Sequence, residues 1–346
     1  MITRVKFDKF TAFEQLEINC SPNINIFIGK NGTGKTHILK TIYAACDIIK
    51  SRKNFAEKIT KVFLPSKEYP GRLVKRSNTS VAGSVEVYRK FVEKDEEIKI
   101  RISLSNHVKS YETVTISGST KRWYQTPFES VYIPVKEMLS NAPGFRSLYN
   151  SRQISFEEIY ADIIDRALLP FLKGPADRAR KKILTILQNE MEGKISIDNE
   201  EFFLRNRQGK LEFSLLAEGF RKLGLLWVLI QNGTLLNGSV LFWDEPEANL
   251  NPQLMKTVVE IILELQRMGV QIFIATHDYV LLKEFDLQAL DTDNIKFHSL
   301  YRNEKTNEIE VKDTRHYLHI DPNSIDDTFA DLVDREIERS MGGLGR

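Results

Sequence analysis

Eight consecutive residues near the amino terminus have the residue types that bind the phosphates of a nucleotide. They fit the pattern Gly-x-x-x-x-Gly-Lys-[Ser/Thr] without a mismatch and are Gly29, Lys30, Asn31, Gly32, Thr33, Gly34, Lys35 and Thr36. The glycines let backbone N–H groups face phosphate oxygens, and the positive end of a following helix adds to the attraction. In this pattern Lys35 reaches the β- and γ-phosphates and the Thr36 hydroxyl binds Mg²⁺. We therefore predict a site for a nucleoside triphosphate with Mg²⁺.

The segments on either side of this loop support the prediction. Apolar residues alternate along residues 24–28, which predicts a buried strand before the loop. After it, Ile38, Ile42, Cys46 and Ile49 recur at helical spacing. A strand, the glycine-rich loop and a helix form the required context, so a plain glycine-rich turn is the weaker alternative.

A second group of candidate residues follows an apolar segment, residues 240–243. This segment predicts a buried strand that ends in Asp244 and Glu245, and ligands bind beyond the carboxyl ends of strands in open α/β sheets. We expect Asp244 to hold Mg²⁺ and Glu245 to act as general base toward the attacking water. The alternative is that Asp-Glu-Pro only turns the chain.

A third apolar segment, residues 270–275, ends at Thr276 and His277. If its strand lies beside the one that ends in Asp244, His277 can contact the γ-phosphate. An isolated histidine is more often structural, but its place one strand after the acidic pair favours a role in the site.

The remaining elements predict an α/β protein of the P-loop NTPase class. Strand patterns at residues 84–91, 97–104 and 112–117 predict an antiparallel sheet, and residues 151–192 have a helical pattern. Short strands are predicted in residues 194–213, and further strands with a final helix from residue 294. We expect a mixed central sheet and an antiparallel β lobe that carry a helical lid insertion. The predicted parts are residues 1–150, 151–204 and 205–346.

These motifs resemble those of bacterial AAA-family ATPases with an ABC/SMC-type head, which include RecF-like and overcoming-lysogenization-defect proteins and occur in several anti-phage systems. The resemblance rests on residues 2–13, 24–36, 243–252 and 275–278. Lys35 and Asp244 are 209 positions apart, which a lid between two lobes accommodates better than an AAA+ ring module does. An Asn-Lys-x-Asp guanine motif is absent from the sequence, so ATP is preferred over GTP.

The resemblance implies a signature segment that crosses to the γ-phosphate of a partner subunit. Residues 216–221 occupy this place, where Gly219 and the start of a helix match the family pattern and Ala217 replaces the family serine. Arg221 and Lys222 are expected to add positive charge there. It follows that two heads would form a homodimer or higher oligomer around two ATP molecules. The alternative for residues 216–221 is that they only cap the following helix and contact no nucleotide.

The family's glutamine loop has no clear counterpart. Glu137 lies where a strand should deliver the glutamine, so it either holds Mg²⁺ through water or belongs to a surface turn. Phe10 and Phe13 are candidates for contact with adenine, although core packing is the favoured role for each.

Composition limits the remaining functions. The formal net charge of +2 gives no strong field for nucleic acid, and the two cysteines are too few for a disulfide framework. The longest apolar run, residues 223–230, is too short to cross a bilayer. We therefore expect a cytoplasmic protein with no membrane partner.

Four roles remain open for such an ATPase. The first is a defence or DNA-surveillance ATPase with a separate effector protein, and the second is a RecF-like DNA-repair ATPase that binds duplex DNA directly. For the second, the candidate contacts are Arg178, Arg180, Lys181 and Lys182, although a solvated helix face explains them more simply. A transporter subunit and a non-catalytic scaffold are disfavoured, by the altered signature and by the intact acidic pair respectively.

Overall fold

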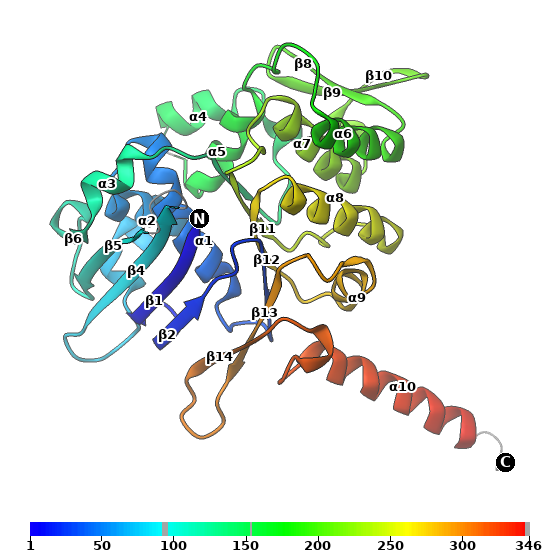
Figure 1. Ribbon diagram of the computed structural model, residues 1–346. Helices are drawn as coiled ribbons and strands as arrows, with labels where there is room; N and C mark the ends of the chain where they lie inside the picture. The colour runs from blue at the N-terminus through cyan, green and yellow to red at the C-terminus, as the bar shows by residue number, and fades with distance from the viewer. Residues whose placement is uncertain (92–95, 153, 343–346) are drawn as a thin grey trace.

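A computed structural model describes residues 1–91, 96–152 and 154–342 of the chain. Its central sheet has six strands in the order β14-β13-β3-β12-β11-β7 (Figure 1). The strands are β3 (Ile24–Ile28), β7 (Ser130–Ile133), β11 (Val240–Asp244), β12 (Gln271–Ala275), β13 (Ile295–Arg302) and β14 (Ile309–Thr314). All neighbours are parallel except β13 and β14. The loops after β3, β11 and β12 therefore meet at one edge of the sheet.

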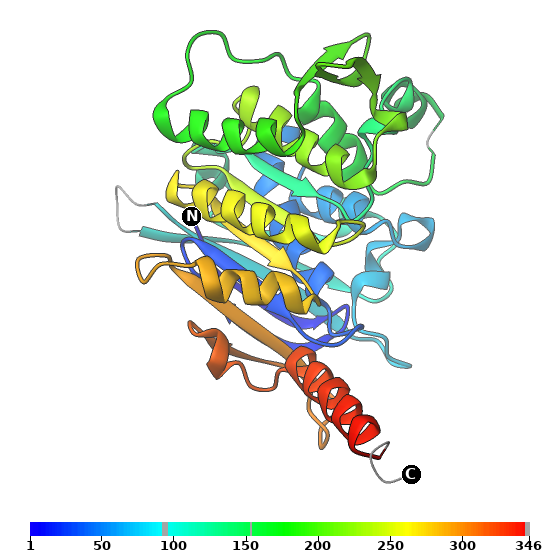
Figure 2. The same ribbon diagram turned by 90° about the vertical axis from the view of Figure 1, so that its right-hand side faces the viewer.

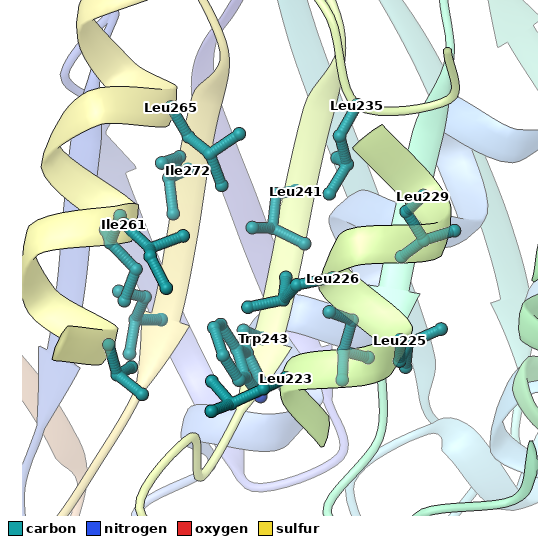
Figure 3. Packing of buried hydrophobic residues seen from close by; sticks show 14 of the residues in the cluster. Leu223, Leu225, Leu226, Leu229, Leu235, Leu241, Trp243, Ile261, Leu265 and Ile272 are labelled. Atoms are coloured by element: carbon teal, nitrogen blue, oxygen red, sulfur yellow. The ribbon is translucent and has the colours of Figure 1, made fainter. Parts of the chain in front are cut away.

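Helices cover both faces of this sheet, and the side chains of each strand alternate between them. On β11, Leu241 and Trp243 belong to the core beneath α7 (Glu218–Gln231) and α8 (Met255–Arg267), as Figure 3 shows. Phe242 belongs to the core on the opposite face, together with residues of α1 (Lys35–Ser51). Strands buried on both faces have nearly continuous apolar sequences, which is why these segments could be recognised from the sequence.

The antiparallel lobe and the final helix were also predicted. The lobe has the strand order β2-β1-β4-β5-β6. Its strands are β1 (Ile2–Phe10), β2 (Phe13–Asn19), β4 (Ala82–Phe91), β5 (Glu96–Ser105) and β6 (Thr115–Gly118). A small third sheet consists of β8 (Lys194–Asp198), β9 (Glu201–Asn206) and β10 (Gly209–Glu212). The last helix, α10 (Ser324–Gly342), extends away from the rest of the chain (Figures 1 and 2).

The segment between the two lobes is helical, as its pattern indicates. It contains α5 (Glu158–Ala167) and α6 (Arg178–Glu190). Helix α4 (Phe145–Arg152) lies almost entirely before residue 151 and was not predicted. Three other helices were not predicted, namely α2 (Phe55–Phe63), α3 (Thr120–Gln125) and α9 (Tyr279–Gln288). All three are no more than three turns long, and α2 and α3 lie in a stretch of mixed pattern, where helical periodicity is hard to detect.

Helices α1, α2 and α5 meet at a buried cluster of charges. The Lys58 ammonium lies 2.6 Å from Asp47, 2.8 Å from Glu158 and 2.7 Å from Asp162, and its side chain has no exposed surface. Arg166 pairs with the second oxygen of Asp47. Burial alone would raise the pKa of Asp47, but Arg166 and Lys58 lower it to about 2. This charge cluster joins the helix after the phosphate-binding loop to the helical segment.

Candidate functional site

The loop of residues 29–36 joins β3 to α1, as predicted. The Lys35 ammonium donates hydrogen bonds to the carbonyls of Gly29, at 2.6 Å, and Lys30, at 3.3 Å, and so lies across its own loop. Burial lowers the pKa of Lys35, and the carboxylates of Glu245 and Asp244 oppose this. The ammonium is therefore inside the loop, with acidic groups near enough to influence it, before any phosphate binds.

Two glycines are required by the shape of this loop. Gly29 has a φ of 140°, and a Cβ atom there would lie 2.1 Å from the Leu300 carbonyl oxygen. Gly34 has a φ of 91°, and its Cβ would lie 2.5 Å from the ring of Phe13. Since L-residues rarely adopt such φ values, both positions need glycine for conformation and for space. Lys30, Asn31 and Gly32 are at the surface, while Thr33 is buried and its hydroxyl bonds to the Lys30 carbonyl.

The predicted metal ligands Thr36 and Asp244 are in direct contact. The Thr36 hydroxyl donates to Asp244 Oδ1 at 3.1 Å, and the Tyr132 hydroxyl on the neighbouring strand β7 donates to Oδ2 at 2.9 Å. Burial raises the pKa of Asp244, and these two hydrogen bonds oppose the rise. The contact of Tyr132 with Asp244 could not be predicted from the sequence, because it depends on the pairing of β7 with β11.

These two oxygen ligands fit a magnesium ion that is shared with phosphate groups. Mg²⁺ prefers oxygen ligands and is commonly bound by one or two protein groups together with phosphates and water. In the part of the chain that the structure describes, no group of three or more His, Cys, Asp or Glu side chains is placed to hold a metal. The donor set therefore suits a metal that arrives with a nucleotide.

Glu245 and His277 lie side by side at the same edge of the sheet. The Nδ1 atom of His277 is 3.5 Å from Glu245 Oε1, and the two side chains are 48% and 31% exposed. Glu245 has a left-handed backbone with a φ of 48°, and its N–H donates to the Ala275 carbonyl of β12. A carboxylate and an imidazole thus face solvent next to the contact between Thr36 and Asp244.

Glu247 is a site residue that the sequence reasoning missed. One of its carboxylate oxygens accepts hydrogen bonds from the Thr276 hydroxyl at 2.8 Å and from the His277 N–H at 3.1 Å. Its other oxygen is buried without a partner among the described residues. Burial raises the pKa of Glu247. This residue links the loop after β11 to the end of β12 and so sets the position of His277.

The signature segment forms the start of α7. Ala217 precedes the helix without a capping side chain, and Gly219 is buried against Leu250. The Arg221 Nε atom lies 3.1 Å from Glu137 Oε2, so the charge of Arg221 is balanced inside the chain. The contribution of Arg221 to a partner's nucleotide site stays a prediction, and within its own chain Arg221 pairs with Glu137.

The structure corrects the hypotheses for Glu137. Its side chain has no exposed surface and accepts hydrogen bonds from the Leu139 N–H and the Ser140 hydroxyl. A position in a surface turn is therefore wrong for this side chain, whose carboxylate pairs with Arg221. A role of Glu137 in holding Mg²⁺ through water stays a prediction. The sequence could not show this pairing because its partners are 84 positions apart.

Two other interpretations are settled by burial. Phe10 and Phe13 are fully buried, in agreement with the favoured core role. The basic run on α6 is not one exposed surface, because Arg180 is buried and donates to the Ile230 and Gln231 carbonyls. Lys182 pairs with Glu264. Arg178 and Lys181 are the exposed cations of that run that have no ion-pair partner among the residues the structure describes.

Comparison with known families identifies the chain. Residues 24–283 match the family model described as "AAA domain, putative AbiEii toxin, Type IV TA system". The chain belongs to this AAA-domain family. The matched region includes the loop of residues 29–36, the acidic pair Asp244 and Glu245, and His277.

Individual relatives of this AAA-domain chain are DNA replication and repair proteins named RecF. The protein from Lactococcus lactis subsp. lactis (strain IL1403) is 23% identical over 210 residues, which are 57% of this chain and 54% of the relative. The protein from Lactobacillus johnsonii is 56% identical over 34 residues, or 10% of this chain and 9% of the relative. The chain thus spans about half, or less, of the length of the curated relatives it matches.

Solved structures show the fold of the AAA-domain chain. An SMC head bound to the C-winged helix domain of ScpA has a TM-score of 0.59 at 13% identity, covering 91% of this chain and 97% of that one. An SMC head with an extended coiled coil, bound to the C-terminal domain of ScpA derived from Pyrococcus furiosus, has a TM-score of 0.56 at 11% identity, with coverage of 97% and 99%. The fold is therefore the ABC-type P-loop head that was predicted. None of the helices in the described ranges has the length and apolarity needed to cross a membrane.

Proposed function

We propose that this chain binds ATP with Mg²⁺ and hydrolyses it to ADP and phosphate. The observation that carries the proposal is the 3.1 Å contact between the Thr36 hydroxyl and Asp244, which joins the phosphate-binding loop to the acidic strand end. Glu245 and His277 lie at the same edge. Strand pairing of β3, β12 and β11 thus gathers groups for phosphate, metal and water from three distant segments.

Each residue has a role that follows from its place. Lys35 would leave the Gly29 carbonyl for the β- and γ-phosphates, and the loop N–H groups would hold their oxygens. Bound Mg²⁺ would neutralise phosphate charge between Thr36 and Asp244. Glu245 would accept the proton of the attacking water, whose oxygen forms the new bond to phosphorus as the bond to ADP breaks. His277 would orient Glu245 or contact the γ-phosphate.

The experiment is a phosphate-release assay with purified protein, ATP and Mg²⁺. Glu245→Gln should lower kcat by at least about a hundredfold, because removal of a general base typically costs that much, while ATP binding persists. Glu260→Gln on α8 is the matched control and should leave kcat unchanged. Phosphate release that needs no Mg²⁺, or that continues in Glu245→Gln at the unaltered rate, would contradict the proposal.

The ATPase is further proposed to act as a homodimer or higher oligomer, with a separate effector protein as its output. Support comes from the start of α7, where Ala217 and Leu215 are exposed and Leu215 is 69% exposed. An exposed helix start with an apolar neighbour suits contact with the nucleotide of a second head. The mass of Glu245→Gln with and without ATP tests this part, and a monomer in both conditions would refute it. A defence role is proposed from the description of the family alone.

Direct binding of duplex DNA is the second candidate function. It is favoured by the RecF relatives, which are named as DNA replication and repair proteins. The interrupted basic run on α6 gives it no support. Binding of duplex DNA that requires ATP and weakens steeply as the salt concentration rises would establish this function. If no such binding is measured, the ATPase that acts on a separate effector protein is the function that remains.

A further inference from the structure

The loop after Asp244 has an unusual backbone that other contacts must hold in place. Glu245 has a φ of 48° and Asn249 a φ of 59°. A left-handed conformation of a residue other than glycine costs on the order of 1–3 kcal/mol and persists where the surroundings enforce it. Within the loop, the Ala248 N–H donates to the Glu245 carbonyl and the Leu250 N–H to the Glu247 carbonyl. The Glu245 N–H and the Glu247 carboxylate attach the start of the loop to the end of β12, while Ala248 and Asn249 are held by other groups.

Helix α7 supplies those groups from outside the loop. The Lys222 ammonium donates a hydrogen bond to the Ala248 carbonyl. One turn earlier on the same helix, Glu218 accepts a hydrogen bond from the Asn249 side chain at 3.0 Å. Two consecutive loop residues are thus attached to the first turns of one helix, which is also the helix that carries the signature segment.

Lys222 is the more unusual of the two attachments, because it is a buried charge. The residue is 1% exposed, and in the described part of the chain no carboxylate lies within ion-pair distance of it. Burial lowers its pKa, while Glu218, Glu247 and Glu245 oppose the shift. A buried ammonium without an ion-pair partner lowers stability, so packing alone does not explain its presence beside this loop.

We propose that Lys222 is a positioning residue, which holds the Ala248 carbonyl so that Glu245 faces the reacting end of the nucleotide. Movement of α7 would then reach Glu245 through this hydrogen bond, and this would couple a contact at the signature segment to hydrolysis at the same head. The inference rests on the proposed ATPase function and adds a residue to its mechanism. Lys222 is buried and bonds to the Ala248 carbonyl, so it would act on the nucleotide site through the loop.

The test compares Lys222→Met with Lys222→Arg and with Lys256→Met, which removes an exposed lysine of α8. Lys222→Met should lower kcat by about tenfold to a hundredfold, since small displacements of a catalytic group have effects of this size. KM for ATP should stay within about twofold, and Lys222→Arg should recover most of kcat because it can donate to the same carbonyl. The Lys256→Met variant should behave as the unaltered protein.

Hydrogen–deuterium exchange of the nucleotide-free variants gives a readout that does not depend on activity. Faster exchange of residues 245–251 in Lys222→Met, with α1 and β12 unchanged, supports the proposal. Equal kcat, equal loop exchange, or exchange that rises throughout the chain would overturn it. If Lys222→Met does not fold, Lys222→Gln takes its place under the same criteria. Failure of the unaltered protein to release phosphate would remove the proposed function, while the loop exchange would still decide the role of Lys222.

Discussion

The strand edge with the predicted site and the charge cluster on α1 differ in how the sequence encodes them. At the strand edge, the glycine-rich loop and the acidic pair are each contiguous and follow a buried strand, and the sheet brings them to 3.1 Å. In the charge cluster, Asp47, Lys58 and Glu158 come from three helices that share no motif. The first arrangement leaves polar groups available for a ligand, while the second uses all of its charges to satisfy one another. Groups that serve a ligand and groups that serve the fold can therefore be separated by their partners.

The comparison predicts the largest loss of stability in the charge cluster. Lys58→Met should lower the free energy of unfolding by about 3–5 kcal/mol, because it leaves buried carboxylates without their cation. The measurement is urea unfolding at neutral pH without nucleotide. Lys53→Met is the control, since that side chain is 32% exposed and its ion pairs should contribute less than about 1 kcal/mol. A loss below 1 kcal/mol in Lys58→Met would show that the cluster is not a structural centre.

At the strand edge we expect a substitution to weaken ligand binding strongly and to change the stability of the fold little. Lys35→Ala should weaken ATP binding at least a hundredfold, or about 2.8 kcal/mol, because the loop loses the charge that meets the phosphates. Unfolding of the nucleotide-free protein should change by less than about 1 kcal/mol, since Lys35 bonds only to carbonyls of its own loop. Calorimetric titration with ATP measures the first effect, with the exposed Lys181→Ala as control. Unchanged affinity would remove the phosphate-binding assignment.

A third prediction concerns how the free energy of unfolding depends on pH, and it uses a buried residue that has no ion-pair partner, unlike the residues of the charge cluster. His298 lies between β3 and β14 without an ion-pair partner in the described chain, and burial lowers its pKa to about 3. The unfolded chain takes up a proton on this residue near pH 6.5, which the folded chain resists, so stability should fall as the pH drops below 6.5. Relative to His298→Gln, the loss should reach about 2 kcal/mol at pH 5. Parallel unfolding curves for the two proteins across pH 7 to 5 would contradict this.

The smallest effect is expected at Tyr132. Tyr132→Phe removes the hydrogen bond to Asp244 Oδ2 and keeps the ring in the core. Apparent Mg²⁺ affinity in the presence of ATP should fall by about tenfold, as is common when a group that orients a metal ligand is lost. ATP binding without Mg²⁺ should not change. If both affinities fall together, Tyr132 supports the strand rather than the metal ligand.

The sequence was informative wherever function depends on neighbouring residues. Lys35, Thr36, Asp244 and Glu245 were found because each lies in a contiguous motif at the end of an apolar strand. The same strands revealed the ABC-type fold, because strands buried on both faces are nearly continuous in apolar residues.

Residues whose partners lie far along the chain could not be found in this way. Tyr132 meets Asp244 across 112 positions, and Lys58 meets Glu158 across 100. Arg221 was expected at a partner's nucleotide and Glu137 either at Mg²⁺ or in a surface turn, and the sequence did not indicate that these two residues form an ion pair. In each case the residue type is compatible with several roles, and its partner is known only once the strands or helices that bring the two residues together are known.

The most direct test of the central claim is a structure of Glu245→Gln with ATP and Mg²⁺. The account predicts the triphosphate in the loop of residues 29–36, with Lys35 on the phosphates and a metal about 2.1 Å from the Thr36 hydroxyl oxygen. Asp244 should bind that metal directly or through water, and residue 245 should face the γ-phosphate. A nucleotide bound elsewhere, or a metal that contacts neither Thr36 nor Asp244, would contradict it.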